Sequence, residues 1–545
     1  MTNERADIAE TKALQSDKDA AALPATLGEF IRERAETLGN KVAGDWFQDS
    51  ERLTYCELDE KADRLASSLV NLGVRKGCHV AVMLPSVPET MISWTALGRI
   101  GAVMVPVNTA YTPTELSFVI NDSDAQYLII HDSCLEIFDK MAGRPEMLIE
   151  HNIIVCGGTT GERQDFSTLV TNGDHPFVPP VPVAGSDLLN IQYTSGTTGF
   201  PKGCMLTHDY WIRTGYSLAV TRGRDHGIEN ALVWPPFFYM DGMWQILSAF
   251  FHGATAFIAR RMSMRRFMDW LIEYDIHTCT FPEPALKTFP PSPADNNVNL
   301  KYVYAFGWRP ESKRQAEQRF GCHARDCYGM TEIGTATVTP VAAAEHNFER
   351  TCGLPTIDRQ LKIVDDAGNP VKQGEPGELW VTGPGIMWGY YKRPEANAEV
   401  FRGAWFRTGD IFRQNAAGYY FIIGRNKEMV KRSGENIAAR EVEAVLNEMP
   451  EIVESAIVPV PDEVRREEVK AYVRLQDGLR PVDCPPAAII AHCESHLAQF
   501  KQPRYIAYIE EFPRTATRKI AKQRMLDDAD DLRLGAFDRA GDVWR

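Results

Sequence analysis

Apolar runs and amphipathic stretches alternate through the first half of the chain. The apolar run VAVMLPS covers residues 80–86, the periodic stretch PETMISWTALGRIGA covers 88–102, and the run VMVPVN covers 103–108. Strand, helix and strand in this order are typical of a parallel α/β unit. Further apolar runs at residues 125–133 (AQYLIIHDS) and 188–194 (LLNIQYT) predict more strands of the same sheet.

The pattern changes twice further along the chain. Apolar residues at helical spacing around 267–274 favour a second α/β region, whereas short alternating pieces separated by glycine turns predict a small β-rich subdomain at about 350–424. Beyond it, a mixture of helices and strands predicts an α+β domain. The β-like pieces are 361–366, 377–383 and 419–424; the last region has helices at 442–449 and 489–500 and strands at 455–460, 469–475 and 505–510.

Together these patterns predict the α/β fold class in two domains. We expect a large N-terminal domain of two α/β subdomains plus the β-rich subdomain, over residues 25–424, and a small mobile α+β C-terminal domain over 425–545. The polar, mixed-charge residues 1–24 lack the apolar core of a signal peptide and are expected to form a flexible extension.

Composition narrows the classes of partner. The 545 residues carry a formal net charge of −14, which disfavours binding to nucleic acid, because that needs a basic surface. No apolar run reaches the roughly 18 to 20 residues of a membrane span, so no membrane insertion is expected. The eleven scattered cysteines contain no CxxC pair, which favours reduced thiols and a cytoplasmic protein.

One polar loop follows the predicted strand at 188–194. The segment YTSGTTGFPKG, residues 193–203, combines three glycines, four hydroxyl side chains and one lysine. Glycines let backbone N–H groups approach phosphate oxygens, hydroxyls add donors, and Lys202 adds a positive charge, so the loop suits a polyphosphate. A simple hairpin turn is the alternative for such a loop taken alone. The residues expected at the phosphates are Thr194, Ser195, Gly196, Thr197, Thr198, Gly199 and Lys202.

Further motifs follow in a fixed order. They are YGMTE at 328–332, WFRTGD at 405–410, GRNKE at 424–428, SGEN at 433–436 and PRTATRK at 513–519. With the loop at 193–203, this series resembles the adenylate-forming superfamily, in its acyl-CoA synthetase branch, with a fainter similarity to carnitine- and crotonobetaine-CoA ligases. The resemblance covers nearly the whole chain and implies ATP, Mg²⁺ and coenzyme A as cofactors and a small carboxylic acid as substrate.

The resemblance also implies roles for single residues. Lys519 corresponds to the catalytic lysine, and Glu332 with Thr198 to the groups that hold Mg²⁺. Tyr328 is expected at the adenine and Asp410 at the ribose hydroxyls. The other residues expected at the cofactors are Gly307, Trp308, Arg309, Asp326, Gly329, Thr331, Arg425, Lys427 as the hinge, and Gly434 beside the pantetheine.

Four departures from the family pattern concern the acyl pocket and the catalytic lysine. Tyr239 stands where many members have a histidine, Trp308 and Arg309 replace small residues, Glu283 replaces a small or apolar residue, and Arg518 replaces a glycine. The aromatic residues of this pocket, with either Asp241 or Glu283, could cage a trimethylammonium group, or they could be core packing or line an apolar pocket. The expected pocket residues are Tyr239, Met240, Asp241, Trp244, Glu283 and Trp308.

The leading hypothesis is an acyl-CoA ligase that first forms acyl-AMP and then the thioester. Two enzymatic alternatives stay open: transfer of a preformed acyl-AMP to coenzyme A, and loading of a carrier protein. A non-catalytic sensor is disfavoured because Lys202, Glu332, Asp410, Arg425 and Lys519 are all present. A homodimer is possible on family habit alone.

Overall fold

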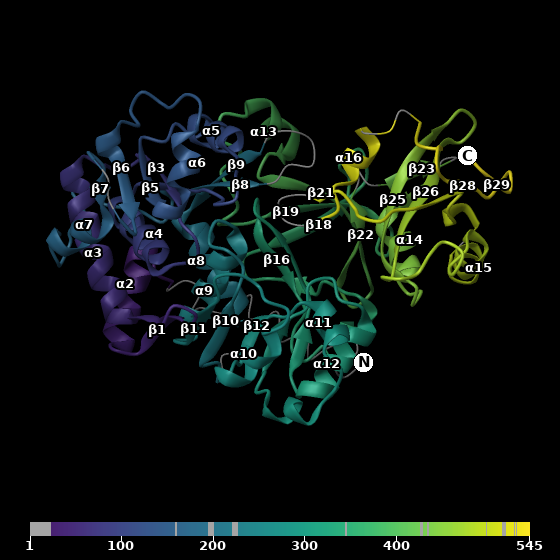
Figure 1. Cartoon of the computed structure of the whole chain (residues 1–545), viewed down its shortest axis with the longest axis horizontal. Coiled ribbons are helices and arrows are strands. Elements are labelled where there is room, and N and C mark those ends of the chain that lie inside the picture. Colours follow the sequence, from purple (N-terminus) through teal and green to yellow (C-terminus); the bar gives the residue numbers. More distant parts are fainter. Residues whose placement is uncertain are drawn as a thin grey trace.

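The computed structural model describes residues 23–158, 161–194, 201–220, 227–343, 346–425, 429–432, 435–497, 499–514, 519–527, 529 and 531–545. Its first large element is a seven-stranded sheet in the order β7-β6-β5-β3-β4-β8-β9, parallel except for the β8–β9 pair (Figure 1). Its inner strands are apolar and buried on both faces, as expected of a parallel sheet covered by helices. The strands are β3 His79–Met83, β4 Val103–Pro106, β5 Tyr127–His131, β6 Ile153–Cys156, β7 Gln164–Asp165, β8 Leu188–Thr194 and β9 Lys202–Thr207.

A second seven-stranded sheet lies beside the first. Its order is β14-β13-β12-β10-β11-β1-β2, and only the edge strand β2 runs antiparallel. The N-terminal hairpin of β1 and β2 therefore completes a sheet whose other strands come some 180 residues later. The strands are β1 Val42–Trp46, β2 Glu51–Thr54, β10 Asn230–Val233, β11 Thr255–Ile258, β12 Thr278–Thr280, β13 Tyr302–Tyr304 and β14 His323–Arg325.

Helices cover both sheets and fill the space between them. Helix α8 is buried along most of its length and packs against α9, α2 and strand β16, so it links the two halves. Local signals set several helix starts, since Thr54 and Glu57 form a capping box before α3. The helices are α2 Leu27–Leu38, α3 Tyr55–Leu72, α4 Pro88–Ile100, α5 Pro113–Asp122, α6 Leu135–Asp139, α7 Phe166–Asn172, α8 His208–Val220, α9 Met240–Phe251, α10 Phe267–Glu273, α11 Glu283–Thr288 and α12 Pro310–Phe320.

Short antiparallel sheets follow the second α/β sheet. Strands β15, β16 and β17 form one, and β18, β19, β21, β20 and β22 form the other, which is the β-rich part that the glycine turns predicted. The bounds are β15 Cys327–Met330, β16 Gly334–Val338, β17 Leu354–Pro355, β18 Gln360–Val364, β19 Gly377–Thr382, α13 Pro394–Val400, β20 Phe401–Arg402, β21 Trp405–Gln414 and β22 Tyr420–Arg425.

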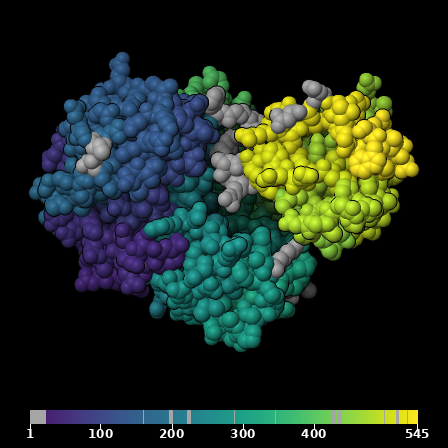
Figure 2. Space-filling view, viewed as in Figure 1, coloured from purple at the N-terminus to yellow at the C-terminus, as the bar shows by residue number. Residues whose placement is uncertain are grey.

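The C-terminal residues form a smaller domain with its own core. A seven-stranded mixed sheet packs on α14 and α15, and Figure 2 shows this part as a separate lobe beside the larger one. Helix α14 and strand β24 contact β22, and Arg350 and Glu448 form an ion pair of 3.6 Å between the two domains. The elements are β23 Met429–Arg432, β24 Glu435–Ala438, α14 Ala439–Leu446, β25 Ile452–Asp462, β26 Arg466–Leu475, α15 Pro486–His496, β27 Tyr505–Tyr508, α16 Lys522–Asp527, β28 Phe537–Asp538 and β29 Val543–Trp544.

The predicted fold class is confirmed: a mixed α/β protein with a large N-terminal and a smaller C-terminal domain. The strands and helices predicted from hydrophobic periodicity are present, with ends that differ by a few residues. No helix in the part of the chain that the structure describes is both long enough and apolar enough to span a membrane.

Candidate functional site

Lys202, Tyr390 and Glu332 form a compact cluster behind the loop at 193–203. Lys202 begins β9, and its Nζ lies 5.1 Å from the centre of the Tyr390 ring. The Tyr390 hydroxyl donates a 2.8 Å hydrogen bond to Glu332 Oε1. Burial and the Glu332 charge both raise the pKa of Tyr390, so its hydroxyl stays a donor. The Lys202 ammonium, the Tyr390 hydroxyl and the buried Glu332 carboxylate thus lie together where the sequence predicts phosphates and Mg²⁺.

Arg359 braces the two segments that carry this cluster. Its guanidinium donates to the carbonyls of Ile333 at 3.0 Å and Gly385 at 3.1 Å. Arg359 therefore connects Ile333, which follows Glu332, to the segment that leads from Gly385 to Tyr390. Arg359 is 6% exposed, and burial lowers its pKa to about 10. It keeps its charge at neutral pH and adds to the backbone hydrogen bond between Met387 N–H and the Glu332 carbonyl, which joins the same two segments.

Tyr328 and Asp410 form the part of the site expected at adenosine. The Tyr328 hydroxyl donates a 2.6 Å hydrogen bond to Asp410 Oδ2, and both side chains are buried. They come from β15 and β21, and β21 pairs with β22 so that Asp410 lies opposite Arg425 in the ladder. Gly329 follows Tyr328 where β15 approaches β16 closely; a Cβ there would lie 2.5 Å from the Gly334 carbonyl oxygen.

Gly307 and Asp326 lie together beside this pair. Both Asp326 carboxylate oxygens accept from the Gly307 N–H at 3.1 Å, and Oδ1 also accepts from the Cys327 N–H at 2.9 Å. Gly307 has φ +64°, which a glycine adopts without strain. Burial raises the pKa of Asp326, and the Lys313 ammonium, 3.6 Å away, opposes that rise. Asp326 therefore holds the 306–308 turn in place.

Trp308, Arg309 and Glu283 lie differently from what a shared ligand pocket needs. Trp308 is 3% exposed and packs edge-on against Phe281 at 5.6 Å, within the core of the second sheet. Glu283 Oε1 accepts from the Arg309 backbone N–H and Nε, both at 3.2 Å, and from the Ser312 hydroxyl at 2.5 Å. Glu283 thus contacts the start of α12 and Trp308 packs in the core, while their predicted places at the cofactor and the acyl pocket stay predictions.

Four predicted pocket residues meet at the start of α9. Tyr239 precedes the helix, and its hydroxyl accepts a 3.1 Å hydrogen bond from Asn108 Nδ2. Met240 Sδ accepts a 3.3 Å hydrogen bond from the Thr331 hydroxyl, which ties this corner to the Glu332 segment. Asp241 Oδ1 accepts from Trp244 Nε1 at 3.3 Å, one helical turn on.

Lys519 and Asp241 interact through their charges. Asp241 is exposed to solvent at the first turn of α9. Desolvation raises the pKa of Asp241, while the Trp244 N–H and the positive charge of Lys519 lower it. The charge of Lys519, the catalytic lysine of the sequence prediction, therefore acts on a residue of the predicted acyl pocket.

Several predicted site residues lie outside the described residues. These are Ser195, Gly196, Thr197, Thr198, Gly199, Lys427, Gly434 and Arg518. Thr194 ends β8, and its hydroxyl donates to the Lys202 carbonyl at 3.4 Å, so the two ends of the phosphate loop meet as a strand pair.

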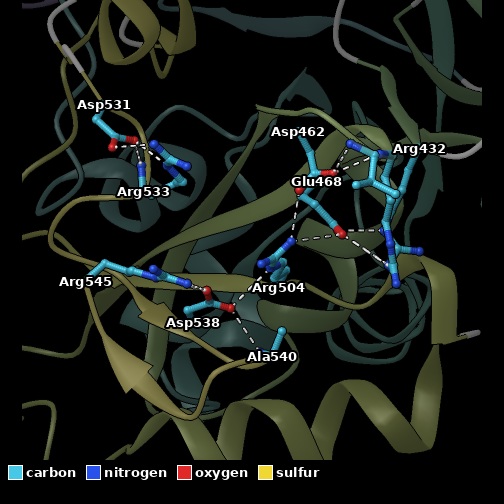
Figure 3. A network of polar contacts seen from close by, with 11 residues as sticks. Arg432, Asp462, Glu468, Arg504, Asp531, Arg533, Asp538, Ala540 and Arg545 are labelled. Carbon is cyan, nitrogen blue, oxygen red and sulfur yellow. Dashed lines mark hydrogen bonds and ion pairs between the residues drawn. The ribbon is translucent and has the colours of Figure 1, made fainter.

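The C-terminal domain holds a second candidate site, which the sequence reading did not find. A cavity of about 890 Å³ is lined by ten residues, four of them arginines. Arg432, Arg465 and Arg504 share the buried Glu468 carboxylate, at 2.6, 3.4 and 3.6 Å (Figure 3). The fourth, Arg539, makes no ion pair with any described carboxylate and donates to the neutral Gln502 Oε1 at 2.5 Å. The lining thus holds four guanidinium groups and two carboxylates, Glu468 and Glu494, and Arg504 also pairs with Asp462 and Asp538. The Arg539 guanidinium, which has no described carboxylate partner, suits an anionic ligand.

Comparison with known proteins agrees with this geometry. The model of the AMP-binding enzyme family matches residues 31–391, and the model of the AMP-binding enzyme C-terminal domain matches 441–519. The chain belongs to the AMP-binding enzyme family. Its match spans both domains described above, so the resemblance inferred from the ordered motifs is confirmed.

Two relatives and one solved structure that the chain resembles are CoA ligases. A crotonobetaine/carnitine–CoA ligase of Proteus mirabilis is 30% identical over 490 residues, covering 87% of this chain and 93% of that protein. A long-chain-fatty-acid–CoA ligase of Yersinia pestis is 27% identical over 529 residues, covering 90% and 92%. The anthranilate CoA ligase AuaEII, solved with anthranoyl-AMP, has a TM-score of 0.83 at 23% identity, covering 94% and 98%. The assignment of this AMP-binding enzyme as an acid–thiol ligase is confirmed.

Two side chains of the candidate sites in this AMP-binding enzyme carried no clear signal in the sequence. Tyr390 lies in the run GYYKRP, where two adjacent tyrosines look alike, and only the fold shows that the first one reaches Glu332 while Tyr391 reaches Asp124. Arg539 lies in the last ten residues, far in sequence from the arginines it joins. Distant residues that converge in this way leave no fixed spacing to recognise.

Proposed function

We propose that the protein is an ATP- and Mg²⁺-dependent acyl-CoA ligase that makes an acyl-AMP and then an acyl-CoA. One observation carries the proposal: the short segment 328–332 joins three groups of residues. Tyr328 bonds Asp410, Thr331 bonds Met240 beside Asp241, and Glu332 accepts from Tyr390, whose ring lies next to Lys202. The phosphate of a single acyl-adenylate would lie near Lys202, its adenosine near Tyr328 and Asp410, and its acyl group near Asp241.

Lys202, Tyr328 and Asp410 would bind ATP. Within the described ranges, the Lys202 ammonium has no carboxylate at ion-pair distance, so its charge is available to phosphate oxygens together with the loop residues Ser195 to Gly199. Asp410 would accept hydrogen bonds from ribose hydroxyls while Tyr328 orients its carboxylate. Gly307 and Asp326 would shape the turn beside the base.

Glu332, with Thr198, would hold Mg²⁺. A buried carboxylate with a hydroxyl donor already in place supplies the hard oxygen ligand that Mg²⁺ prefers, so the described residues fit the ion. When bound, the ion neutralises phosphate charge. Tyr390 positions Glu332, since its hydroxyl fixes one carboxylate oxygen.

Lys519 would act in the first half-reaction. A carboxylate oxygen of the acid attacks the α-phosphorus of ATP, a new P–O bond forms, and the bond to pyrophosphate breaks. The Lys519 ammonium would offset the negative charge that grows on the reacting oxygens. In the second half-reaction the thiol sulfur of coenzyme A attacks the acyl carbon and AMP leaves. Rotation of the C-terminal domain about Lys427 would exchange Lys519 for the segment near Gly434.

The arginine cavity favours coenzyme A over a carrier protein as acceptor. Coenzyme A carries three phosphate groups, and this concave cavity offers the Arg539 guanidinium, which has no described carboxylate partner, beside three paired arginines. All eleven cysteines are free thiols, which supports a reducing, cytoplasmic location. Carrier-protein loading and transfer of preformed acyl-AMP remain the alternatives, and a homodimer stays a prediction.

The test follows both products. Wild type is incubated with ATP, Mg²⁺, coenzyme A and a panel of short fatty, aryl, terpenoid and zwitterionic acids, and pyrophosphate and acyl-CoA are quantified by mass spectrometry. We expect one class of acid to give both products in equal amounts. Lys519→Ala should abolish pyrophosphate release, whereas the exposed Lys140→Ala control should not. Thioester formed only from synthetic acyl-AMP would overturn the proposal in favour of the transfer reaction, and acylation of a carrier protein without acyl-CoA would favour the loading enzyme.

A further inference from the structure

Two histidines lie one helical turn apart at the C-terminal end of α15. His492 and His496 stand at positions i and i+4, so both side chains lie on one face of the helix, with their ring centroids 4.3 Å apart. Histidines at this spacing bind a metal ion together. Helix α15 packs against α14 in the C-terminal domain (Figure 1). The segment that follows α14 brings a third side chain, Glu448, to the histidine pair.

The three side chains lie within reach of one ion. One ring nitrogen of each histidine and one carboxylate oxygen of Glu448 all lie within 4.8 Å of one another. Zinc with bonds of about 2.0 to 2.1 Å holds its ligand atoms roughly 3.4 Å apart, so these atoms need to approach by at most about 1.5 Å. Glu448 and His496 are exposed, which leaves their side chains room for that movement. Two imidazoles and a carboxylate suit Zn²⁺, whereas Mg²⁺ prefers oxygen ligands.

Backbone carbonyls orient both rings. His492 Nε2–H donates a 3.0 Å hydrogen bond to the Val445 carbonyl. His496 Nδ1–H donates a 2.8 Å hydrogen bond to the His492 carbonyl, with Ser495 Oγ 2.9 Å from the same nitrogen. When the rings are neutral, these bonds leave Nδ1 of His492 and Nε2 of His496 with a lone pair. A ring N–H bonded to a backbone carbonyl is the arrangement that orients metal-bound histidines.

The electrostatic setting favours a cation, and one cationic side chain already uses it. His492 and His496 lie in the last turn of α15, and Glu448 follows the end of α14, so all three lie at helix C-terminal ends, which carry partial negative charge. Arg350 of the large domain forms a 3.6 Å ion pair with Glu448 Oε1 across the domain border. A metal ion on Glu448 and the Arg350 guanidinium repel each other, so the two compete for this carboxylate.

We propose that Glu448, His492 and His496 form a zinc-binding site at the border between the two domains, in competition with Arg350. Zinc on Glu448 weakens the ion pair that joins this residue to the large domain, so the ion and the contact between the domains are coupled. The inference goes beyond the proposed ligase function and does not depend on it, because zinc binding at this site needs neither ATP nor a carboxylic acid.

Titration calorimetry of the whole protein with Zn²⁺ at pH 7.5 tests the site. His496→Ala and Glu448→Gln, both at exposed positions, should weaken binding of one Zn²⁺ per chain by about tenfold or more, since loss even of a group behind a ligand costs that much. His151→Ala is the matched control: it removes an exposed histidine that is bonded to Gln164, and it should bind Zn²⁺ as wild type does. Circular dichroism checks that each variant is folded. Equal Zn²⁺ affinity in wild type, His496→Ala and Glu448→Gln, or an equal loss in His151→Ala, would overturn the proposal.

A second pair of variants tests the competition with Arg350. Arg350→Gln should bind Zn²⁺ several-fold more tightly than wild type, because a repelling charge next to the ion is gone. Arg260→Gln removes a guanidinium from a surface pair with Asp49 and should leave the affinity unchanged. Weaker or unchanged binding in Arg350→Gln would contradict the coupling to the domain border. Neither titration involves turnover, so failure of the ligase assay and failure of this site are read separately.

Discussion

The Tyr390 hydroxyl donates a 2.8 Å hydrogen bond to Glu332 Oε1, and the Lys202 ammonium lies over the same ring. One side chain thus touches both the expected metal ligand and the expected phosphate lysine, from a segment nearly 60 residues further along the chain than Glu332. The Tyr390 ring therefore connects the two charged groups that are expected to contact an ATP·Mg²⁺ complex.

Loss of the Tyr390 hydroxyl should weaken metal use more than folding. In Tyr390→Phe the buried Glu332 loses the 2.8 Å hydrogen bond that fixes Oε1. We expect the Mg²⁺ concentration for half-maximal pyrophosphate release to rise about tenfold, the range for a hydrogen bond to a charged group. Tyr391→Phe is the matched control because its hydroxyl bonds the exposed Asp124 instead. Equal effects in both variants would contradict a role for Tyr390 in positioning Glu332.

Removal of the Tyr328 hydroxyl should raise the KM for ATP. Tyr328→Phe keeps the ring but leaves Asp410 Oδ2, in a buried pair, without its 2.6 Å donor. The carboxylate would then be less well oriented toward ribose hydroxyls, and we expect a KM for ATP several-fold to about tenfold higher with a smaller change in kcat. Initial rates of pyrophosphate release over a range of ATP concentrations measure this. A changed kcat with a constant KM would place Tyr328 elsewhere in the reaction.

The arginine cavity predicts a selective effect on coenzyme A. Arg539→Gln removes the guanidinium that has no described carboxylate partner, and the KM for coenzyme A should rise about tenfold while the first half-reaction keeps its rate. Arg545→Gln serves as control, because Arg545 pairs with Asp538 and does not line the cavity. If the KM for coenzyme A is the same in Arg539→Gln, Arg545→Gln and wild type, the nucleotide of coenzyme A binds to another surface.

Trp308 should matter for stability and little for nucleotide binding. It is 3% exposed and packs against Phe281, so Trp308→Ala leaves a cavity and should cost about 3 to 5 kcal/mol of unfolding free energy. Denaturant unfolding measures this loss, and ATP kinetics are taken well below the unfolding temperature. A large rise in the KM for ATP with unchanged stability would instead indicate that Trp308 contacts the nucleotide.

Lys470 predicts a pH dependence of stability. It is 1% exposed, donates to the Leu532 carbonyl at 2.6 Å, and burial lowers its pKa from 10.5 to about 8. Between these two values the unfolded chain binds the proton more strongly, so stability rises with pH across that window. Relative to Lys470→Met, wild type should therefore gain stability between pH 7 and pH 10 in urea unfolding. If the difference in unfolding free energy between wild type and Lys470→Met stays constant or falls as pH rises, the Lys470 ammonium is not a buried cation at neutral pH.

The chain's local pattern was enough to predict the fold class and the position of the motifs. Continuous apolar runs predicted β3, β4, β5 and β8, because strands covered by helices on both faces must be apolar throughout. The spacing of Val442, Val445 and Leu446 predicted α14 in the same way. Glycine, hydroxyl and lysine at 193–203 predicted chemistry, since phosphate binding needs those groups in one short segment.

What the tertiary structure alone decided is which side chains face each other. Glu283 and Asp241 are both acidic side chains, yet Arg309 at the start of α12 pairs with Glu283, whereas Asp241 at the start of α9 is exposed and bonds Trp244. Trp308 and Phe306 are two residues apart, and the turn at Gly307 buries one and exposes the other. Contacts between residues far apart in sequence depend on how the sheets and helices pack, so no local pattern encodes them.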